Sequence, residues 1–380
     1  MAKKLGFGCM RLPLLDKDDQ TSFDTKTINN LVDTFLQKGF TYFDTAYVYH
    51  SYMSEEAVRA ALVQRHSREE FELATKLPMR DIKTVEDQEK VFNEQLEKCG
   101  VEYFDYYLLH NIGVISYKKA CELDSFSFGI QKKQEGKIKH LGMSFHDTPE
   151  LLDEILTAHP ELDFVQLQIN YIDWENPSIQ SRRCYEIARK HHKPIIVMEP
   201  CKGGSLALVP EKAEKLMKDY NPEASIPSWA IRFAASQEGV IMVLSGMNSM
   251  EQVLDNTSYM ADLKPLNEEE YKIINQVSEI INENTAIPCT TCRYCEKGCP
   301  QNIAIADYFA LYNSSKRATS NNFSSQFVYY LNLVANHGKA SDCIDCKQCE
   351  EACPQHLQIT EHLKDVSATF DVTPQFPSRK

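Results

Sequence analysis

The C-terminal part of the chain contains one cysteine pattern twice, and this pattern restricts how that part can fold. The spacing C-x2-C-x2-C-x3-C-P occupies residues 289–300 and returns at residues 343–354. Thiolates at this spacing can each bind one corner of a compact iron–sulfur cubane. The doubled pattern therefore predicts a C-terminal unit that holds two 4Fe-4S clusters.

The fourth cysteine of each motif follows the third at a longer spacing, and we expect it to point away from the cluster that the first three hold. In paired motifs of this spacing it binds the other cluster. The first cluster is predicted to be bound by Cys289, Cys292, Cys295 and Cys353. The second is predicted to be bound by Cys343, Cys346, Cys349 and Cys299.

A pair of zinc sites is the alternative interpretation of these cysteines. Zinc motifs use C-x2-C pairs that are separated by a longer spacer. Here each motif places four cysteines within eleven residues. The spacing therefore favours iron–sulfur clusters.

Composition and charge narrow the class of protein further. The chain has 41 Lys and Arg against 54 Asp and Glu, a net charge of −13, which argues against nucleic acid as a partner because phosphate binding requires clustered cations. No apolar run is long enough for a membrane span or a secretion signal. The other five cysteines are scattered and odd in number, which fits free thiols and predicts a cytoplasmic protein. They are Cys9, Cys99, Cys121, Cys184 and Cys201.

Between residues 41 and 261, short β-rich segments alternate with amphipathic helical segments. This alternation predicts parallel strands joined by right-handed crossovers. Seven strand candidates, with a short eighth near Ala224–Ser225, predict a (β/α)8 barrel. A doubly wound open sheet is the alternative, but no G-x-G-x-x-G sequence follows the first strand. The seven candidates are Thr41–Ala46, Phe71–Lys76, Asp105–His110, Lys139–Phe145, Phe164–Asn170, Pro194–Pro200 and Val240–Gly246.

After Leu263 the strand signals stop. Asn267 and the three glutamates that follow predict a helix start, because the asparagine caps the helix and the acids complement its dipole. Residues 304–312 and 324–335 also have helical character. The predicted division is a barrel at 1–263, an α-helical dicluster domain at 264–370 and a tail at 371–380.

Polar residues stand at the carboxyl ends of the first predicted strands, where barrel enzymes place their chemistry. Asp44, Lys76 and His110 end three successive strands, and Tyr49 follows shortly after Asp44. A tyrosine has an ordinary pKa of about 10, and a nearby cation such as Lys76 would lower it. Each residue alone could serve a structural role, in a turn or in packing. Together they predict a proton-handling site with Tyr49 as the general acid, Asp44 bonded to Lys76, and His110 orienting a carbonyl oxygen.

These residues resemble the aldo/keto reductase family over about residues 4–262. The D-T-A-x-x-Y run of that family stands at residues 44–49, its strand-end lysine is Lys76, and its L-x-H sequence ends at His110. The resemblance implies that Asp44, Tyr49, Lys76 and His110 form the catalytic tetrad. It also implies an oxidoreductase that reduces aldehydes or ketones by hydride transfer from NAD(P)H without a Rossmann domain.

The resemblance further implies a cofactor site along the barrel mouth. The carboxamide would be held by Ser144 and Gln166, with Asn170 nearby; the ribose would contact Gly8, Cys9 and Met10; the pyrophosphate would contact Gly203, Gly204 and Leu206; and the adenosine end would contact Gly246, Met247, Asn248, Gln252 and Asn256. Three positions depart from the family: Met198 stands where an aromatic ring often stacks on the nicotinamide, Phe145 follows Ser144 in place of asparagine, and Gln252 stands where an arginine often binds the 2′-phosphate. NADP and NAD both stay open as the cofactor.

The two kinds of site pose a chemical problem, because a nicotinamide passes two electrons as hydride and each cluster passes one. In one hypothesis the barrel is a carbonyl reductase and the clusters are structural or sense redox state. In a second, the clusters carry electrons between a ferredoxin or other redox partner and the barrel, which normally requires a flavin. In a third, the barrel is a redox-sensing scaffold. The four strand-end residues favour the first, with a small carbonyl compound as substrate.

Overall fold

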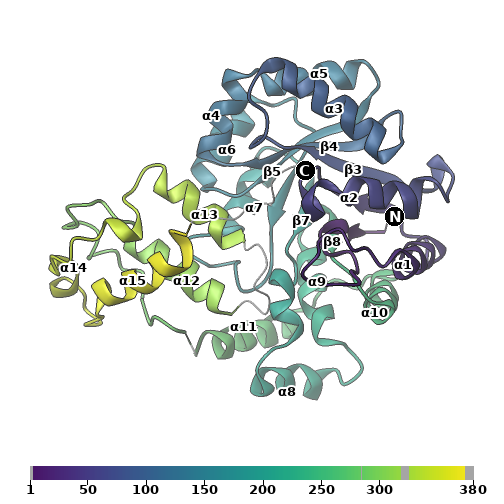
Figure 1. Cartoon of the computed structure of the whole chain (residues 1–380). Helices are drawn as coiled ribbons and strands as arrows, with labels where there is room; N and C mark the ends of the chain where they lie inside the picture. The colour runs from purple at the N-terminus through teal and green to yellow at the C-terminus, as the bar shows by residue number, and fades with distance from the viewer. Residues whose placement is uncertain (1–2, 284, 318–324, 373–380) are drawn as a thin grey trace.

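A computed structural model describes residues 3–283, 285–317 and 325–372. Its centre is a closed barrel of eight parallel strands in sequence order (Figure 1). The predicted (β/α)8 barrel is therefore confirmed, and the open doubly wound sheet is not formed. The strands are β1 (Leu5–Gly8), β2 (Tyr42–Asp44), β3 (Glu72–Leu77), β4 (Phe104–Ile112), β5 (Ile138–Phe145), β6 (Phe164–Gln168), β7 (Ile195–Met198) and β8 (Val240–Ser245).

The short eighth strand predicted near Ala224–Ser225 was wrong. The strand that closes the barrel is β1, at the N-terminal end, which pairs with both β2 and β8. Ser225 is instead the N-cap of helix α9 (Ile226–Ser236). Strand β1 has only four residues, two of them glycine, so it lacks the β-branched character that identifies a strand. Gly6 is needed there, because a Cβ would come within 2.8 Å of Leu244 and 2.9 Å of Tyr42.

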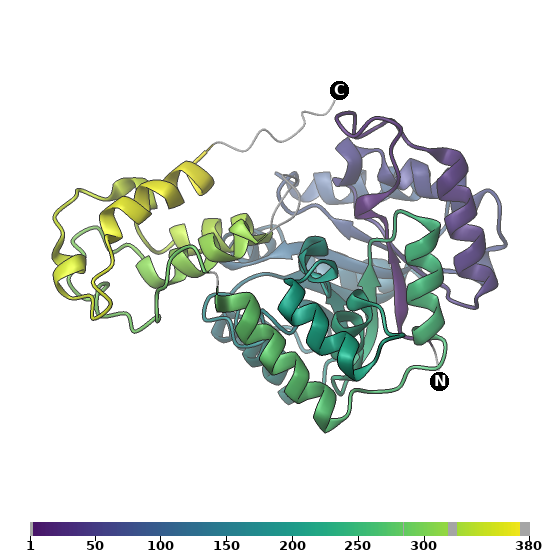
Figure 2. The same ribbon diagram turned by 90° about the horizontal axis from the view of Figure 1, so that it is seen from below.

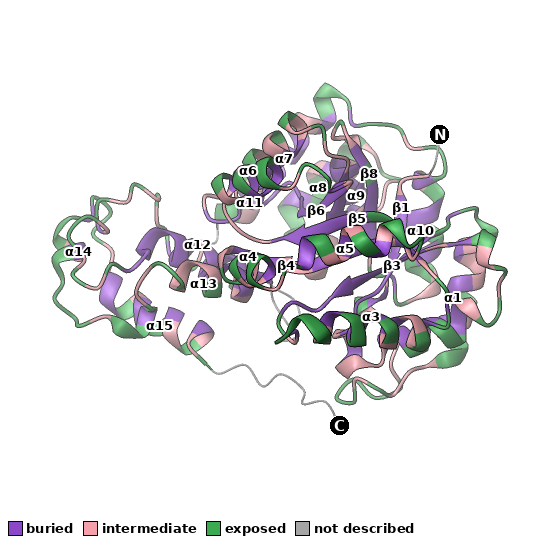
Figure 3. Cartoon of the chain, turned by 90° about the horizontal axis from the view of Figure 1, so that it is seen from above, coloured by how far each residue is buried: buried purple, intermediate pink, exposed green. Residues whose placement is uncertain are grey.

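Amphipathic helices surround the barrel and cover its outer face (Figure 3). Helix α3 shows how the sequence sets their ends: Thr84 and Asp87 form a capping box, and Gly100 ends the helix with φ +70°. The remaining helices around the barrel are α1 (Thr25–Gln37), α2 (Ser54–Val58), α4 (Val114–Glu122), α5 (Ser125–Gln134), α6 (Pro149–Ala158), α7 (Ser181–Lys190), α8 (Glu211–Tyr220) and α10 (Met250–Met260); α3 spans Val85–Cys99.

Helix α11 (Glu268–Glu283) follows the predicted domain boundary but packs on the barrel side of the molecule. Its buried residues Ile273, Ile274 and Val277 belong to the same apolar cluster as the barrel residues. The division between 263 and 264 stays a prediction. Among the described helices, none combines the length and the apolar character that a membrane crossing requires.

The remaining helices and the two cysteine loops form a second unit with its own apolar core, here called the cluster domain. It projects from one side of the barrel (Figures 1 and 2). Its helices are α12 (Ile305–Lys316), α13 (Ser325–Val334), α14 (Gln348–Glu351) and α15 (Ile359–Phe370). The helical character predicted at 304–312 is present, as is that of 325–334; most of the predicted tail, residues 373–380, lies outside the described residues.

The repeat in the cluster domain extends beyond the cysteines. The carboxylate of Glu296 accepts a hydrogen bond of 2.9 Å from Ala306 N, at the start of α12. Fifty-four residues later, Glu350 accepts an equivalent bond of 2.9 Å from Thr360 N, at the start of α15. Each cysteine loop thus supplies an acid to the N-terminus of the helix that follows it.

Candidate active site and cluster cavities

Strands β2 and β3 place Asp44 and Lys76 side by side at the carboxyl end of the barrel. The Lys76 Nζ lies 2.6 Å from Asp44 Oδ1 and donates a second bond of 2.7 Å to the carbonyl oxygen of Thr45. The two side chains are only 1% and 4% exposed. Because a buried charge without its partner is strongly unfavourable, the pair holds both side chains in one arrangement.

Tyr49 begins a short 3-10 turn (Tyr49–Tyr52) that carries its ring over Lys76. The Lys76 Nζ lies 5.1 Å from the centre of that ring. His50 and Ser51 in this turn have positive φ values of 49° and 54°, a conformation that is unfavourable for residues other than glycine. His50 also accepts a hydrogen bond of 3.2 Å from Leu12 N. The loop that follows β1 therefore holds this turn in place.

His110, on β4, faces the same phenol. The rings of Tyr49 and His110 are 6.0 Å apart and nearly perpendicular. Burial lowers the pKa of His110 well below its ordinary value, and the charge of Lys76 adds to this effect. The imidazole is therefore neutral at physiological pH and can orient a carbonyl oxygen without adding charge.

The electrostatics of Tyr49 differ from the sequence expectation in one respect. The charge of Lys76 and its hydrogen bond lower the pKa of Tyr49, as expected, but burial raises it more, so the net pKa is above its ordinary value. Burial also acts against the charge of Lys76, yet Asp44 and Tyr49 outweigh it and raise the pKa of the lysine. The site thus holds a protonated phenol beside a charged ammonium.

The residues expected near the carboxamide occupy the ends of β5 and β6. The Ser144 hydroxyl accepts a bond of 2.8 Å from Asn111 N, and Gln166 Nε2 donates a bond of 3.2 Å to Asp44 Oδ2. Asn170 is differently placed, because its side chain bonds Asp173 and the carbonyl oxygen of Glu199. Ser144 and Gln166 therefore lie with the tetrad, whereas Asn170 shapes a turn.

The expected phosphate loop lies after β7, which ends at Met198. Gly203 and Gly204 adopt φ values of +66° and +102°, which residues with a side chain rarely adopt. The buried ion pair between Lys202 and Asp173 anchors the start of this loop. Leu206 is buried at its end.

The expected adenosine loop lies after β8 and has its own internal bonds. Gln252 Oε1 accepts a bond of 2.8 Å from Asn248 N, so this side chain closes the loop at Gly246 and Met247. Asn256 Nδ2 donates a bond of 3.0 Å to Ser245 Oγ. Gln252 therefore serves as a loop cap in this arrangement.

The first barrel loop contains Gly8, Cys9 and Met10, and also a residue that the sequence analysis missed. The Arg11 Nη2 lies 3.4 Å from where a Cβ on Gly203 would be, and its Cδ lies 3.3 Å from where a Cβ on Gly246 would be. In the described part of the chain, no hydrogen bond or ion pair is found for this guanidinium. The sequence shows only that Arg11 follows Gly8, Cys9 and Met10, and this does not reveal its approach to two distant glycine loops.

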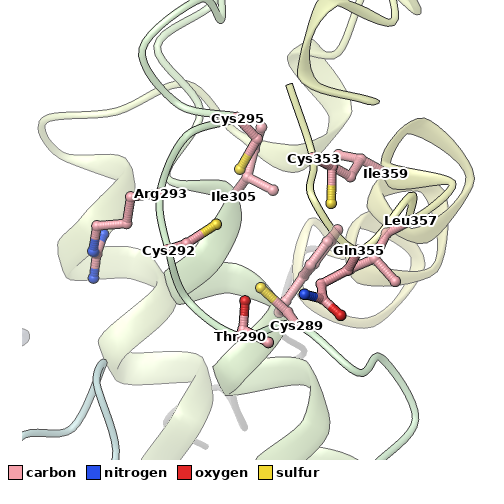
Figure 4. Close-up of a pocket in the computed structure, with 11 residues that line it drawn as sticks. Cys289, Thr290, Cys292, Arg293, Cys295, Ile305, Cys353, Gln355, Leu357 and Ile359 are labelled. Carbon is pink, nitrogen blue, oxygen red and sulfur yellow. The ribbon is translucent and has the colours of Figure 1, made fainter. Parts of the chain in front are cut away.

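The eight motif cysteines line two cavities in the cluster domain. The first cavity has four sulfurs around it (Figure 4), contributed by Cys289, Cys292, Cys295 and Cys353. The second is lined by Cys299, Cys343, Cys346 and Cys349. Each cavity thus combines three cysteines of one motif with the last cysteine of the other. Thiolates placed around such a space suit a cubane.

A basic side chain lines each cavity, and the two basic side chains have different surroundings. Arg293, beside the first cavity, bonds Asp307 through two nitrogens at 2.6 and 2.7 Å. Asp307 also accepts a bond of 3.1 Å from the hydroxyl of Ser178, in the loop after β6. Lys347 occupies the equivalent position at the second cavity and is exposed. Hydrogen bonds therefore link the side of the cluster domain that lines the first cavity to the barrel.

Comparison with known proteins agrees with both parts of this architecture. Residues 4–279 match the aldo/keto reductase family and residues 288–357 match a 4Fe-4S dicluster domain. An uncharacterized oxidoreductase, YqkF, from Bacillus subtilis is 25% identical over 297 residues, covering 71% of the chain and 91% of that protein. Two solved structures share the barrel fold. The holo form of an aldo-keto reductase from Bacillus halodurans has a TM-score of 0.58 at 23% identity, covering 72% of this chain and 91% of its own. An aldo-keto reductase from Klebsiella pneumoniae in complex with NADPH has a TM-score of 0.59 at 18% identity, covering 73% and 91%.

Proposed function

Because the chain belongs to the aldo/keto reductase family and carries a 4Fe-4S dicluster domain, we propose that it reduces a small carbonyl compound with NAD(P)H and that Tyr49 donates the proton. The observation that carries this proposal is the buried Lys76–Asp44 pair beneath the ring of Tyr49. It keeps a buried positive charge next to a protonated phenol.

The proposed mechanism assigns one task to each of the four residues. NAD(P)H supplies the hydride when it is bound. Tyr49 transfers its proton to the carbonyl oxygen, and the charge of Lys76 stabilises the phenolate that remains. Asp44 holds the ammonium in place, and neutral His110 orients the carbonyl oxygen toward the phenol. These roles require both the short Lys76–Asp44 distance and the burial of the site.

We assign the dinucleotide to the carboxyl end of the barrel. Ser144 and Gln166 would hold the carboxamide, and the glycine loop with Arg11 would hold the phosphates, because a guanidinium between two glycine loops is suited to bind an anion. The loop after β8 would contact the adenosine. The complex of the Klebsiella pneumoniae reductase with NADPH supports NADP(H) as the cofactor.

In the cluster domain, each cavity would hold one 4Fe-4S cluster on its four cysteines. We propose that residues 264–370 act as the dicluster domain, with α11 as the helix that connects it to the barrel. In this proposal the clusters stabilise the domain or sense redox state, because hydride transfer to a carbonyl requires no single-electron carrier.

A second candidate function is electron transfer between a ferredoxin-like partner and the barrel. It is favoured by the exposed second cavity, where residues 344–348 are all exposed at the end of the molecule that carries α14 (Figure 1). The first cavity, by contrast, is bonded to the barrel through Asp307 and Ser178. Exchange between hydride and single electrons would then require a flavin or an equivalent group.

Anaerobic spectroscopy separates the two candidates. Purified protein should contain about eight iron atoms per chain and absorb near roughly 400 nm, as expected for two thiolate-bound clusters. NADPH is then added under argon. If NADPH is consumed only when an aldehyde is present and the cluster absorbance is unchanged, the reductase proposal holds. Bleaching of the clusters by NADPH alone would favour electron transfer.

A further inference from the structure

Helix α13 of the cluster domain contacts the loops that follow strands β4 and β5. Asn332 Nδ2 donates a bond of 2.8 Å to the carbonyl oxygen of His146, the first residue after β5. The same amide lies against Gly113, just after β4, where a Cβ would come within 2.3 Å of Asn332 Nδ2. The contact is therefore close, since a side chain at position 113 would displace the Asn332 amide.

This contact places Tyr329, one turn earlier on α13, against the same barrel residue. The rings of Tyr329 and His146 are 5.7 Å apart in an edge-to-face arrangement, which is a favourable geometry for two aromatic rings. Tyr329 is only 5% exposed. A side chain of the cluster domain is therefore packed on the mouth of the barrel.

The groups around Tyr329 show which loops lie near it. Burial raises the pKa of Tyr329 well above its ordinary value, and the charges of Asp173, Asp147 and Glu199 raise it further. These three carboxylates follow β6, β5 and β7, respectively. The loops that follow β5, β6 and β7 thus lie near Tyr329, which contacts His146 directly.

The tetrad is reached from Tyr329 through two histidines. Protonation of His146 would lower the pKa of His110 further, and the ring of His110 faces the ring of Tyr49. Burial also lowers the pKa of His146 to about 4, so both imidazoles are neutral at physiological pH. Ring contacts thus join His110 to Tyr49 and His146 to Tyr329.

Within residues 3–283, 285–317 and 325–372 the hydroxyl of Tyr329 bonds no other group, and unlike the hydroxyl of Tyr171 its oxygen is not closed off from solvent. A tyrosine hydroxyl that solvent reaches bonds water, and a polar group of a ligand can replace that water. The neighbouring Tyr330 differs, because its hydroxyl bonds Asp371 at 2.6 Å and accepts a bond from Ala340 N. Of the two adjacent tyrosine hydroxyls, only that of Tyr330 forms hydrogen bonds with other groups of the protein.

We propose that Tyr329 is a substrate-positioning residue that the cluster domain supplies to the reductase site, and that its hydroxyl bonds a hydroxyl group of the substrate next to the reacting carbonyl. This inference rests on the proposed function. The hydroxyl of Tyr329 can donate and accept a hydrogen bond, and the two neighbouring imidazoles are neutral, so this position favours an uncharged polar group. The substrate class is therefore an uncharged hydroxy-aldehyde or hydroxy-ketone.

The test compares glyceraldehyde with propanal, which has the same carbon chain without hydroxyl groups. The wild-type protein should show the higher kcat/KM with glyceraldehyde. Tyr329→Phe should lower that kcat/KM about tenfold, mainly through KM, because one hydrogen bond of roughly 1.4 kcal/mol is lost. Its kcat/KM with propanal should change less than about twofold. The affinity for NADPH, measured by fluorescence titration, and the cluster absorbance should be unchanged.

Tyr330→Phe is the matched control, because it makes the same chemical change on the same helix but removes a bond inside the cluster domain. It should leave the ratio of the two kcat/KM values at the wild-type level. The inference is overturned if Tyr329→Phe keeps that ratio, if both aldehydes lose activity equally, or if the wild type does not prefer glyceraldehyde. If the wild-type protein reduces neither aldehyde nor any other carbonyl compound with NADPH, the proposed function is overturned and the inference with it.

Discussion

The ammonium nitrogen of Lys76 lies 2.6 Å from Oδ1 of Asp44, and almost none of either side chain is exposed. Such a pair contributes little net stability relative to an apolar pair of the same size, but removal of one member leaves an uncompensated buried charge. A buried pair that is costly to form and costly to break is better explained by the chemistry of Tyr49 above it than by stability.

Replacement of Lys76 by methionine tests this relationship. Lys76→Met should lower the free energy of unfolding by about 3–5 kcal/mol, because Asp44 is then buried without its cation. The double variant Asp44→Asn/Lys76→Met should recover most of that loss. Thermal unfolding of the wild type, both single variants and the double variant gives the coupling between the two residues. If the two losses are additive, the pair does not act as a unit.

Tyr49→Phe tests the proton donor. Loss of the hydroxyl should reduce kcat by about 10²–10⁴, the usual contribution of a positioned general acid. The affinity for NADPH should be unchanged, because the proposed cofactor contacts lie on other residues. Tyr52→Phe is the control, since it is on the same turn but bonds Asp81 at 3.1 Å instead. Wild-type turnover in Tyr49→Phe would remove Tyr49 as the proton donor.

Arg11→Gln tests the anion site between the two glycine loops. Hydrogen bonds to charged groups contribute about 1.5–3 kcal/mol, so the dissociation constant for NADPH should rise roughly 10–100-fold. Titration with NADH identifies the phosphate: an equal loss for both nucleotides indicates the pyrophosphate, and a loss for NADPH alone indicates the 2′-phosphate. Arg59→Gln, which removes a guanidinium bonded to Glu97 O, is the control. Unchanged affinity for both nucleotides would contradict the assignment.

The parts of this architecture that could be predicted from sequence depend on local patterns. The alternation of segments predicts the barrel because each strand and helix is recognisable within a short window. Asp44, Lys76 and His110 lie together because the carboxyl ends of neighbouring parallel strands meet at one end of a barrel. The cysteine sets follow from the spacing alone, since three ligands of each set are only two residues apart.

The parts that could not be predicted depend on contacts between distant segments. Arg11 and Gly203 are far apart in sequence, and neither residue has a local signal for the other. Tyr329 lies in a helix whose pattern predicts only packing, so its approach to His146 requires the position of the whole cluster domain. The net pKa of Tyr49 could not be predicted either, because it depends on how far burial outweighs the charge of Lys76.

The unequal cations at the two cavities lead to a redox prediction. Arg293 is held beside the first cavity by Asp307, whereas Lys347 at the equivalent position of the second is exposed. Nearby charge and solvent exposure tune the potential of an iron–sulfur cluster. Arg293→Gln should therefore lower the midpoint potential of one cluster, and Lys347→Gln should have a smaller effect because water screens that charge. EPR-monitored redox titration measures both, and a larger shift in Lys347→Gln would contradict the prediction.

A buried acid behind the active site makes the stability of the barrel depend on pH. Glu55 is fully buried on α2, where its carboxylate accepts bonds from Thr75 and Gln95. Burial raises the pKa of Glu55 from 4.5 to about 7, despite those two bonds. Because Thr75 precedes Lys76 on β3, the ionisation of Glu55 acts directly behind the tetrad.

The sign of the pH dependence follows from this shift. Below pH 4.5 the carboxyl is protonated in both the folded and the unfolded chain and contributes no pH dependence. Between pH 4.5 and about 7 only the folded chain keeps the proton, so the free energy of unfolding falls as the pH rises. The loss is complete above about pH 7 and amounts to about 3 kcal/mol.

Glu55→Gln removes the ionisation and should be more stable than the wild type at pH 8, with no such advantage at pH 4.5. Thermal unfolding across this range measures the difference, with Glu97→Gln on the exposed side of α3 as the control for loss of a charge. If the difference in stability between the wild type and Glu55→Gln is the same at pH 8 as at pH 4.5, the ionisation of Glu55 does not destabilise the fold.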